Sequence, residues 1–147
     1  MTVALNGQDI AQKIGEQFAD SLIYADKTTV MVKNQVLYKV AEYLKNTPGL
    51  DFDYLTNLTS VDYMDYFEII YHLLSLKQNH SLVLKTRCYG REELSVPSVY
   101  NLWKTADYQE REIYDLMGIT FEGHPNMKRI VLWPEFNGYP LRRDYLQ

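Results

Sequence analysis

The stretch EREIYDLMGITFEGHP, from Glu110 to Pro125, decides how the second half of this chain folds. Upstream of it, apolar residues recur at steps of three and four, which predicts an amphipathic helix that runs into the stretch. Gly118 is the natural end of that helix, because glycine tolerates the left-handed conformation at a helix C-terminus. Beyond Gly118 no regular period continues, so the stretch marks the change from regular structure to an irregular tail.

The predicted helix carries a charged residue on its apolar face. We expect the helix to open at Pro97 and Ser98, with Ser98 as its N-cap. Its apolar stripe runs through Val99, Trp103, Ala106, Glu110, Ile113 and Met117. Glu110 stands where an apolar residue belongs, and a buried carboxylate is costly unless it is paired and hydrogen-bonded. We therefore predict that an arginine of the tail, Arg129 or Arg142, holds Glu110.

The other charges of this helix lie near its C-terminal end, where the helix dipole disfavours negative charge. Arg111 and Asp115 are four residues apart, and this spacing favours an ion pair between them. For Glu112 two interpretations stay open, a solvated surface position and a specific contact.

The tail after Gly118 is aromatic and basic but irregular. It carries Phe121, Trp133, Phe136, Tyr139 and Tyr145, too many aromatic residues for a disordered segment. The pairs Lys128-Arg129 and Arg142-Arg143 supply N–H donors that suit carboxylates. We expect an ordered C-terminal arm over residues 119–147, tied back partly to the helix and laid partly across another protein. Residues 1–118 would form an α+β part of the same single domain.

The first two thirds of the chain predict alternating helices and strands. Apolar periodicity predicts helices within residues 7–21 and 34–46, the second capped by Asn34. A hairpin over residues 21–32 turns at Asp26-Lys27, and three further strands are expected: one ending near Tyr63, then residues 66–76 and 80–88. The turn at residues 77–80 makes the last two strands antiparallel. The fold class is α+β, a small mostly antiparallel sheet with helices packed mainly on one face, followed by an extended C-terminal arm.

Composition excludes several classes of protein. With 147 residues the chain forms one domain, and a net charge of -4 argues against a dedicated nucleic-acid binder. The single cysteine, Cys88, cannot form a disulfide or a four-thiolate iron–sulfur site within this chain and indicates a reduced compartment. The N-terminus does not read as a signal peptide, and no apolar run is long enough to span a bilayer. We expect a soluble or peripheral protein.

No residue pattern predicts chemistry carried out by this chain alone. His72, His80 and His124 lack metal-ligand spacing; we interpret His72 as a structural histidine and His124 as a residue that orders its loop through hydrogen bonds. Cys88 is expected to be an inert thiol in the core. Hydrolase, P-loop and dinucleotide motifs are missing from the sequence. The sequence therefore predicts no catalytic, cofactor-binding or metal-binding residues.

Helix and tail together resemble the 30 kDa family of respiratory complex I, the C-type subunit of NADH–quinone oxidoreductase. The resemblance rests on two motifs in the last third of the chain, and strands further upstream also resemble the family. The first motif comprises Glu110, Arg111, Glu112, Asp115, Gly118, Phe121, Gly123, His124, Pro125 and Arg129. The second lies in the arm that begins at Pro134 and comprises Pro140, Leu141, Arg142, Arg143, Asp144 and Tyr145. Two positions depart from the family: Lys128, where arginine is common, and Tyr108, where tryptophan is frequent.

The resemblance implies a cofactor-free, non-catalytic component in the peripheral arm of a proton-translocating enzyme, where it serves assembly. Iron–sulfur clusters, flavin and quinone would belong to partner subunits. The expected partners are the D-like subunit at the quinone site, docked through the arm from Pro134 onward, and the iron–sulfur subunits B and I. No nucleic-acid partner is expected. The chain would reach the membrane only through the complex, on the cytoplasmic side of the inner membrane or the equivalent face of a thylakoid.

Two alternatives to this function stay open. The same motifs fit the equivalent subunits of membrane-bound hydrogenases, of plastid or cyanobacterial NDH complexes and of F420H2 dehydrogenases. An independent RNA-binding module of similar architecture is the second alternative, because the predicted sheet is aromatic and carries Lys85 and Arg87. RNA binding would give a strongly salt-dependent affinity for single strands, whereas a structural subunit would show none.

Overall fold

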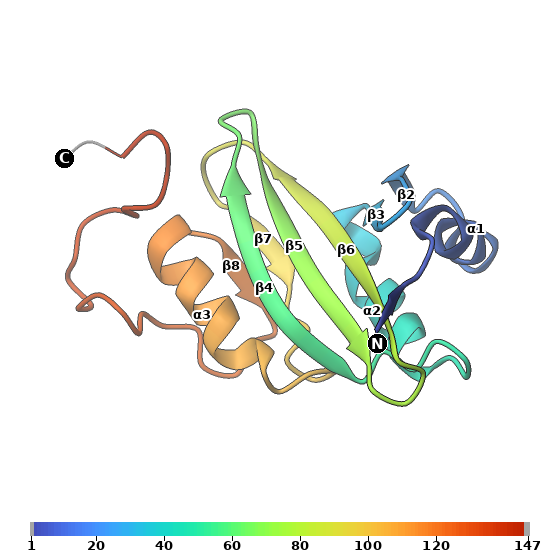
Figure 1. Cartoon of the computed structure of the whole chain (residues 1–147). Coiled ribbons are helices and arrows are strands. Elements are labelled where there is room, and N and C mark those ends of the chain that lie inside the picture. Colours follow the sequence, from blue (N-terminus) through green and yellow to red (C-terminus); the bar gives the residue numbers. More distant parts are fainter. Residues whose placement is uncertain (1, 146–147) are drawn as a thin grey trace.

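The structure is a computed structural model that describes residues 2–145. Its centre is a six-stranded sheet in the order β2–β3–β6–β5–β4, with β1 paired to the start of β6 (Figure 1). The strands are β1 Val3–Ala4, β2 Leu22–Ala25, β3 Thr29–Val32, β4 Tyr54–Asp62, β5 Tyr66–Ser75 and β6 His80–Tyr89. The hairpin β2–β3 and the antiparallel pair β5–β6 are confirmed.

Two strand pairings within this sheet are parallel and were not predicted. β3 pairs with β6, and β1 pairs with the first residues of the same strand. Both pairings join residues about fifty or more positions apart in the sequence. Local periodicity carries no signal for such a pairing, because alternation shows which face a side chain takes and not which strand lies beside it.

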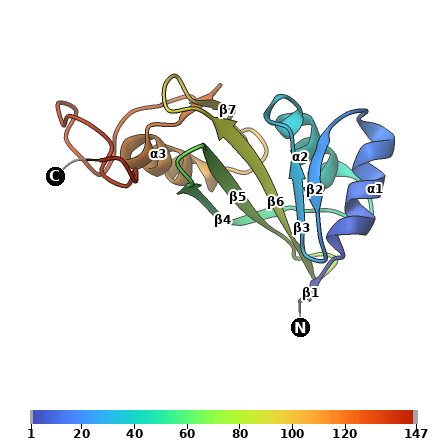
Figure 2. The same cartoon turned by 90° about the horizontal axis from the view of Figure 1, so that it is seen from above.

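All helices contribute to one core on one face of the sheet. They are α1 Gly7–Gln17, the short 3-10 helix η1 Asn34–Val36, α2 Leu37–Asn46 and α3 Ala106–Met117. Along β5, Phe67, Ile69, Tyr71 and Leu73 alternate into this core, where residues of the helices meet them. α1 and α2 flank the β2–β3 side and α3 flanks β4 (Figure 2). The α+β fold with helices mainly on one face is confirmed.

The predicted N-cap of α2 is wrong. Asn34 opens η1 rather than α2, and its side-chain amide donates to the carbonyl of Ser95, 2.8 Å away. The side chain is thus used to join this turn to the strand that begins at Ser95. By contrast, Asn6 caps α1 by accepting the backbone N–H of Gln8.

The predicted start of α3 is also wrong. The helix begins at Ala106, and residues 98–105 form a series of turns instead of two helical turns. Ser98 still accepts a backbone N–H, that of Tyr100, but its hydroxyl donates to Glu110 further along the chain. This tertiary contact holds the serine beside Glu110 rather than at the N-terminus of α3. All six residues of the apolar stripe are nevertheless buried, as predicted.

Two short strands were not predicted from the sequence. β7 Ser95–Pro97 and β8 Thr120–Glu122 form a separate parallel pair. Ile119 and Phe121 are buried in the core. The prediction placed the arm from residue 119, but residues 119–122 are part of the packed domain, and the segment without regular structure begins at residue 123. From there the chain runs along the far side of α3, at the opposite end of the molecule from α1 (Figures 1 and 2).

Candidate functional site

Glu110 is fully buried beneath the N-terminal half of α3. Its carboxylate accepts the hydroxyl of Ser98 at 2.6 Å and the backbone N–H of Val99 at 2.9 Å. Burial raises the pKa of Glu110 to about 7, although the two hydrogen bonds oppose that shift. The buried hydroxyl of Tyr71 has no hydrogen-bond partner within residues 2–145, and its pKa is raised by burial and then by the charge of Glu110. From inside the core, Glu110 therefore holds the backbone at Ser98 and Val99, ahead of the turns that lead into α3.

The predicted arginine partner of Glu110 is wrong. Arg129 pairs with Asp115, and Arg142 donates to the main-chain carbonyls of Met117 and Arg91. Among residues 2–145 no cation forms an ion pair with Glu110; a serine hydroxyl and one amide hold it instead. The sequence did not indicate these donors. It is the series of turns between Val99 and α3 that places Ser98 and Val99 close to Glu110.

Asp115 organises the first part of the arm. One carboxylate oxygen accepts the backbone N–H groups of Ile130, Val131 and Leu132 at 3.0, 2.6 and 3.0 Å. The other accepts a guanidinium nitrogen of Arg129 at 3.0 Å. We call this arrangement the Asp115 cradle. Burial alone would raise the pKa of Asp115, but the three amides and the guanidinium outweigh it, so the pKa lies below its ordinary value.

The predicted Arg111–Asp115 pair is wrong, because the cradle already fills both oxygens of Asp115. Arg111 instead donates to the carbonyl of Lys128 in the arm at 3.3 Å. Glu112 is exposed, which agrees with the solvated alternative. The charges of α3 thus act on the arm rather than on one another.

A second anchor ties the end of the arm to the sheet. Arg91 forms a two-point contact with the buried carboxylate of Asp62, at 2.6 and 2.8 Å, and also pairs with Asp144 at 2.8 Å. The Arg91 guanidinium lowers the pKa of Asp62, because its hydrogen bonds outweigh the opposing effect of burial. The backbone N–H of Arg143 donates a further hydrogen bond to Asp62. Asp62 and Arg91 were not singled out in the sequence, since they lie outside both motifs.

The arm also closes tightly over the end of α3. Gly118 has φ 76°, and a Cβ atom there would lie 2.6 Å from Arg142 and 2.7 Å from the ring of Tyr139. The backbone N–H of Leu141 donates to the carbonyl of Leu116 at 3.0 Å. Glycine is therefore required at this helix end for two reasons, its left-handed conformation and the space that the arm occupies.

The arm exposes large apolar side chains although its backbone is anchored. Val131 is 58% exposed, Trp133 61% and Leu141 61%. Pro134 and Arg143 are exposed as well, whereas Pro140 and Tyr145 are half-buried. Exposed apolar side chains on an anchored backbone form a surface suited to contact with another protein.

His124 orders its loop, as predicted. Its Nδ1 accepts the backbone N–H of Asn126 at 2.9 Å, and its Nε2 lies 3.0 Å from a carboxylate oxygen of Asp107. Within the same motif, Gly123 has φ 90° and Pro125 is exposed. The loop between β8 and the arm is thereby fixed to α3.

Of two further predictions, the one for Cys88 is confirmed and the one for His72 is wrong. Cys88 is buried in the core, as expected, and burial raises the pKa of its thiol to about 11. His72 is exposed on the outer face of β5, so its interpretation as a structural histidine satisfied within an apolar strand is wrong. The two residues next to His72 in the sequence, Tyr71 and Leu73, are buried on the opposite face of the strand.

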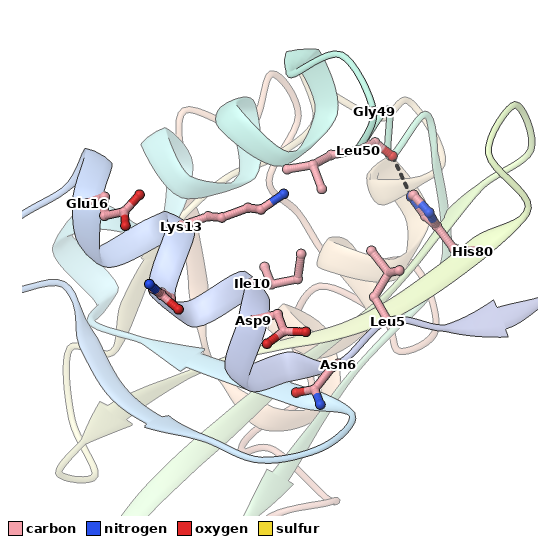
Figure 3. A pocket seen from close by; sticks show the side chains of 10 residues that line it. Leu5, Asn6, Asp9, Ile10, Lys13, Glu16, Gly49, Leu50 and His80 are labelled. Atoms are coloured by element: carbon pink, nitrogen blue, oxygen red, sulfur yellow. Dashed lines mark hydrogen bonds between the residues drawn. The ribbon is translucent and has the colours of Figure 1, made fainter.

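A hollow of about 540 Å³ lies at the other end of the molecule, between α1 and the segment Gly49–Leu50 (Figure 3). Its base is apolar, with Leu5, Ile10 and Leu50, and its rim is formed by exposed charged residues of α1. His80 reaches the same hollow, but its Nε2 is 2.7 Å from the carbonyl of Leu50 (Figure 3). The histidine is thus held in a structural contact.

The outer face of the sheet does not present free basic side chains at the predicted positions. Lys85 lies 2.9 Å from one carboxylate oxygen of the buried Glu68, and Arg87 lies 3.9 Å from the other. Arg87 also covers the ring of Tyr66 at 4.2 Å. Because both cations have an acidic neighbour, the observation that favoured an RNA-binding surface is weakened.

Within residues 2–145, no group of three or more histidine, cysteine, aspartate or glutamate side chains is arranged to hold a metal ion. In the same part of the chain, none of the helices has the length and apolar character needed to cross a bilayer.

Comparison with known proteins agrees with the motifs. Residues 30–147 match the family described as "Respiratory-chain NADH dehydrogenase, 30 Kd subunit". The C-type subunit of NADH-quinone oxidoreductase from Roseiflexus castenholzii is 36% identical over 149 aligned positions, which cover 97% of this chain and 85% of that protein. A protein of Phocaeicola vulgatus, named as the combined C/D component of NADH-quinone oxidoreductase, is 42% identical over 105 positions, covering 71% of this chain and 20% of that longer protein.

The fold is also similar to that of a solved structure. A chain in the structure of the membrane-bound sulfane sulfur reductase, an archaeal respiratory membrane complex, superposes with a TM-score of 0.74. The match covers 94% of this chain and 84% of that one, and with 23% identity it supports the fold alone. Since the family match spans most of the sequence and a relative is 36% identical over nearly all of it, the chain belongs to the 30 kDa subunit family of respiratory-chain NADH dehydrogenase.

Proposed function

We propose that this chain is a structural subunit of a proton-translocating NADH–quinone oxidoreductase, with no catalytic activity of its own. Its task is assembly: through the C-terminal arm it docks the D-like subunit of the quinone site. The observation that carries this proposal is the combination of an internally anchored arm with exposed Val131, Trp133 and Leu141. One relative is named as a combined C/D component of NADH-quinone oxidoreductase. A protein that combines the two components gives independent support to a D-like partner.

The remaining parts of the proposal follow from the family. The iron–sulfur subunits B and I are the other expected neighbours, and the clusters, flavin and quinone belong to partner chains. The chain lies on the cytoplasmic side of the membrane, or the equivalent thylakoid face, and is held there by the complex. Equivalent subunits of related hydrogenase, NDH and F420H2 dehydrogenase complexes remain alternatives for the same role.

Removing residues 134–147 tests the docking role. The truncated chain keeps the Asp115 cradle, which uses only residues up to Leu132, and it keeps the whole core. Far-UV circular dichroism should therefore show a folded domain, while the amount recovered in the membrane complex should fall sharply. Truncated protein that assembles at the normal level would refute a docking role for residues 134–147.

The double variant Arg142→Ala/Arg143→Ala separates two contributions of the arm. Arg142 is an internal anchor whose guanidinium donates to the carbonyls of Met117 and Arg91, whereas Arg143 contributes its backbone N–H to Asp62. We expect reduced recovery in the complex with the core still folded, and the single variant Arg142→Ala should account for most of the loss. If Arg143→Ala alone gave the full loss, that arginine side chain would contact the partner directly.

Purification of the isolated chain tests the non-catalytic role. The protein should be colourless, without iron, flavin or bound nucleotide, when purified without added metal. Stoichiometric iron or a flavin absorption spectrum would contradict this part of the proposal.

A further inference from the structure

The segment Arg129–Phe136 has a fixed backbone before any partner is present. Three successive amides donate to Asp115, and Arg129 reaches from the same carboxylate to the carbonyl of Gly138 at 3.0 Å. At its far end the N–H of Phe136 closes a turn on the carbonyl of Trp133 at 3.0 Å. This presenting loop, residues 129–136, is therefore ordered mainly by polar contacts, and its apolar side chains are half-buried or exposed.

Two of its apolar side chains remain in solvent. Val131 is 58% exposed and Trp133 is 61% exposed. The ring of Trp133 stands edge-on to Phe136 with the centroids 5.2 Å apart, and Phe136 in turn stacks on Tyr145. The indole N–H of Trp133 makes no hydrogen bond to any residue from 2 to 145. Tryptophan is one of the residue types most enriched among interface hot spots. Trp133 is exposed and is supported from one side by Phe136.

We propose that Val131 and Trp133 form the anchor that enters an apolar socket on the D-like partner, and that Asp115 is the positioning residue that presents them. This inference rests on the proposed docking function and names its central contact. The socket has an apolar wall and one hydrogen-bond acceptor, because a buried indole N–H requires a partner. The relative named as a combined C/D component is the reason to place this socket on the D-like partner rather than on a second copy of the chain.

The polar cradle explains why such a loop binds well. An apolar side chain on a flexible loop loses conformational entropy when it docks, and that loss weakens binding. The Asp115 cradle fixes the loop during folding, so docking orders little further backbone. The charge of Asp115 is directed at main-chain amides, which leaves Val131, Trp133 and Pro134 as exposed apolar residues of the loop, beside the exposed Glu135.

A competition experiment measures the contribution of Trp133. Wild-type and Trp133→Ala chains with different tags are expressed together in the native host, and the membrane complex is purified. The variant's share should be about 30-fold below the wild-type share, the effect of losing an interface hot spot. Leu76→Ala is the matched control: Leu76 is 66% exposed, lies outside the arm, and should compete equally with the wild type.

The same variant distinguishes docking from folding. Trp133 is mostly exposed, so the isolated Trp133→Ala chain should melt at the wild-type temperature. A lowered melting temperature would make Trp133 a structural residue and overturn the inference. Equal incorporation of the variant would overturn it as well, while the truncation of residues 134–147 would still decide the docking function separately.

Cysteine labelling shows whether the loop is covered. A Val131→Cys chain is treated with N-ethylmaleimide, free and within the complex, and the labelled peptide is measured by mass spectrometry. Cys88 does not compete, because it is buried. We expect labelling at position 131 to slow at least about tenfold in the complex, as for a fully desolvated contact. Unchanged labelling, or protection that appears in the isolated chain at high concentration and is lost on dilution, would overturn the inference.

Discussion

Two carboxylates of α3, Glu110 and Asp115, are both fully buried, yet their surroundings change their proton affinity in opposite directions. Glu110 has two neutral donors, and burial raises its pKa to about 7. Asp115 has three amides and a guanidinium, which outweigh the effect of its own burial and lower its pKa. The number of donors, the presence of a cation and the depth of burial together decide whether such a carboxylate stays charged.

The difference matches the two tasks of the helix. Glu110 holds Ser98 and Val99 inside the domain, where burial favours the neutral acid over the anion. Asp115 holds the arm, which has no apolar core of its own and depends on charge and hydrogen bonds for its order. The helix therefore has one polar contact directed into the core and another directed toward the proposed interface.

Asp115→Ala is expected to have the largest effect. It leaves the guanidinium of Arg129 and three backbone N–H groups without their acceptor, and breaking a buried pair in this way costs about 3–5 kcal/mol. Chemical denaturation of the isolated chain measures the loss. Asp115→Asn, which keeps an acceptor oxygen but not the charge, should lose less. If Asp115→Ala were as stable as the wild type, the arm would not depend on the cradle.

Glu110→Gln is expected to change how stability depends on pH. A carboxyl with pKa about 7 when folded and 4.5 when unfolded binds more protons in the folded state, so stability falls as pH rises through this window. At about 1.4 kcal/mol for each pKa unit, the loss between about pH 4 and about pH 8 approaches about 3 kcal/mol. Glutamine does not titrate and should abolish this decline.

Urea denaturation at several pH values measures this prediction. Asp62 and Asp115, whose pKa values are lowered in the folded state, stabilise the protein above about pH 4 and lose that effect as the pH falls below it. Wild-type stability should therefore be greatest near about pH 4 to 5, and only its alkaline side should respond to Glu110→Gln. Identical pH profiles for the two chains would show that Glu110 is ionised normally, and the comparison with Asp115 would fail.

Arg111→Ala is expected to have the smallest effect. The half-buried arginine makes one hydrogen bond, to the carbonyl of Lys128 at 3.3 Å, and no ion pair with Asp115 within the described residues. Loss of such a surface contact costs about 0.5 kcal/mol. Thermal melting checks this value. A loss comparable to that of Asp115→Ala would restore the helix pair expected from the i, i+4 spacing.

Periodicity predicted the elements whose structure depends on neighbouring residues. The apolar stripe from Val99 to Met117 is buried throughout, the pair β5–β6 is antiparallel, and Gly118 ends the helix in the left-handed conformation. The loop-ordering role of His124 also follows from local contacts. These features were predictable because their signals lie close to one another in the sequence.

Predictions failed where a side chain takes a partner from a distant segment. Ser98 looks like an N-cap, but its hydroxyl is used by Glu110, and Asn34 is used by Ser95. The place of Glu110 on the apolar stripe suggested that an arginine of the tail meets it, whereas Arg129 meets Asp115. Each partner is chosen by the path of the backbone between two segments, and local spacing does not contain that path.

By itself the sequence determined the α+β class, the family and the presence of a polar residue in the apolar stripe of α3, because period and residue type carry this information. Only the tertiary structure decided which groups meet the two carboxylates, and that residues 119–122 belong to the core while the arm begins after them. The physical reason is that a buried charge has several acceptable partners in the sequence. Chain geometry brings only one set of donors within hydrogen-bonding distance of it.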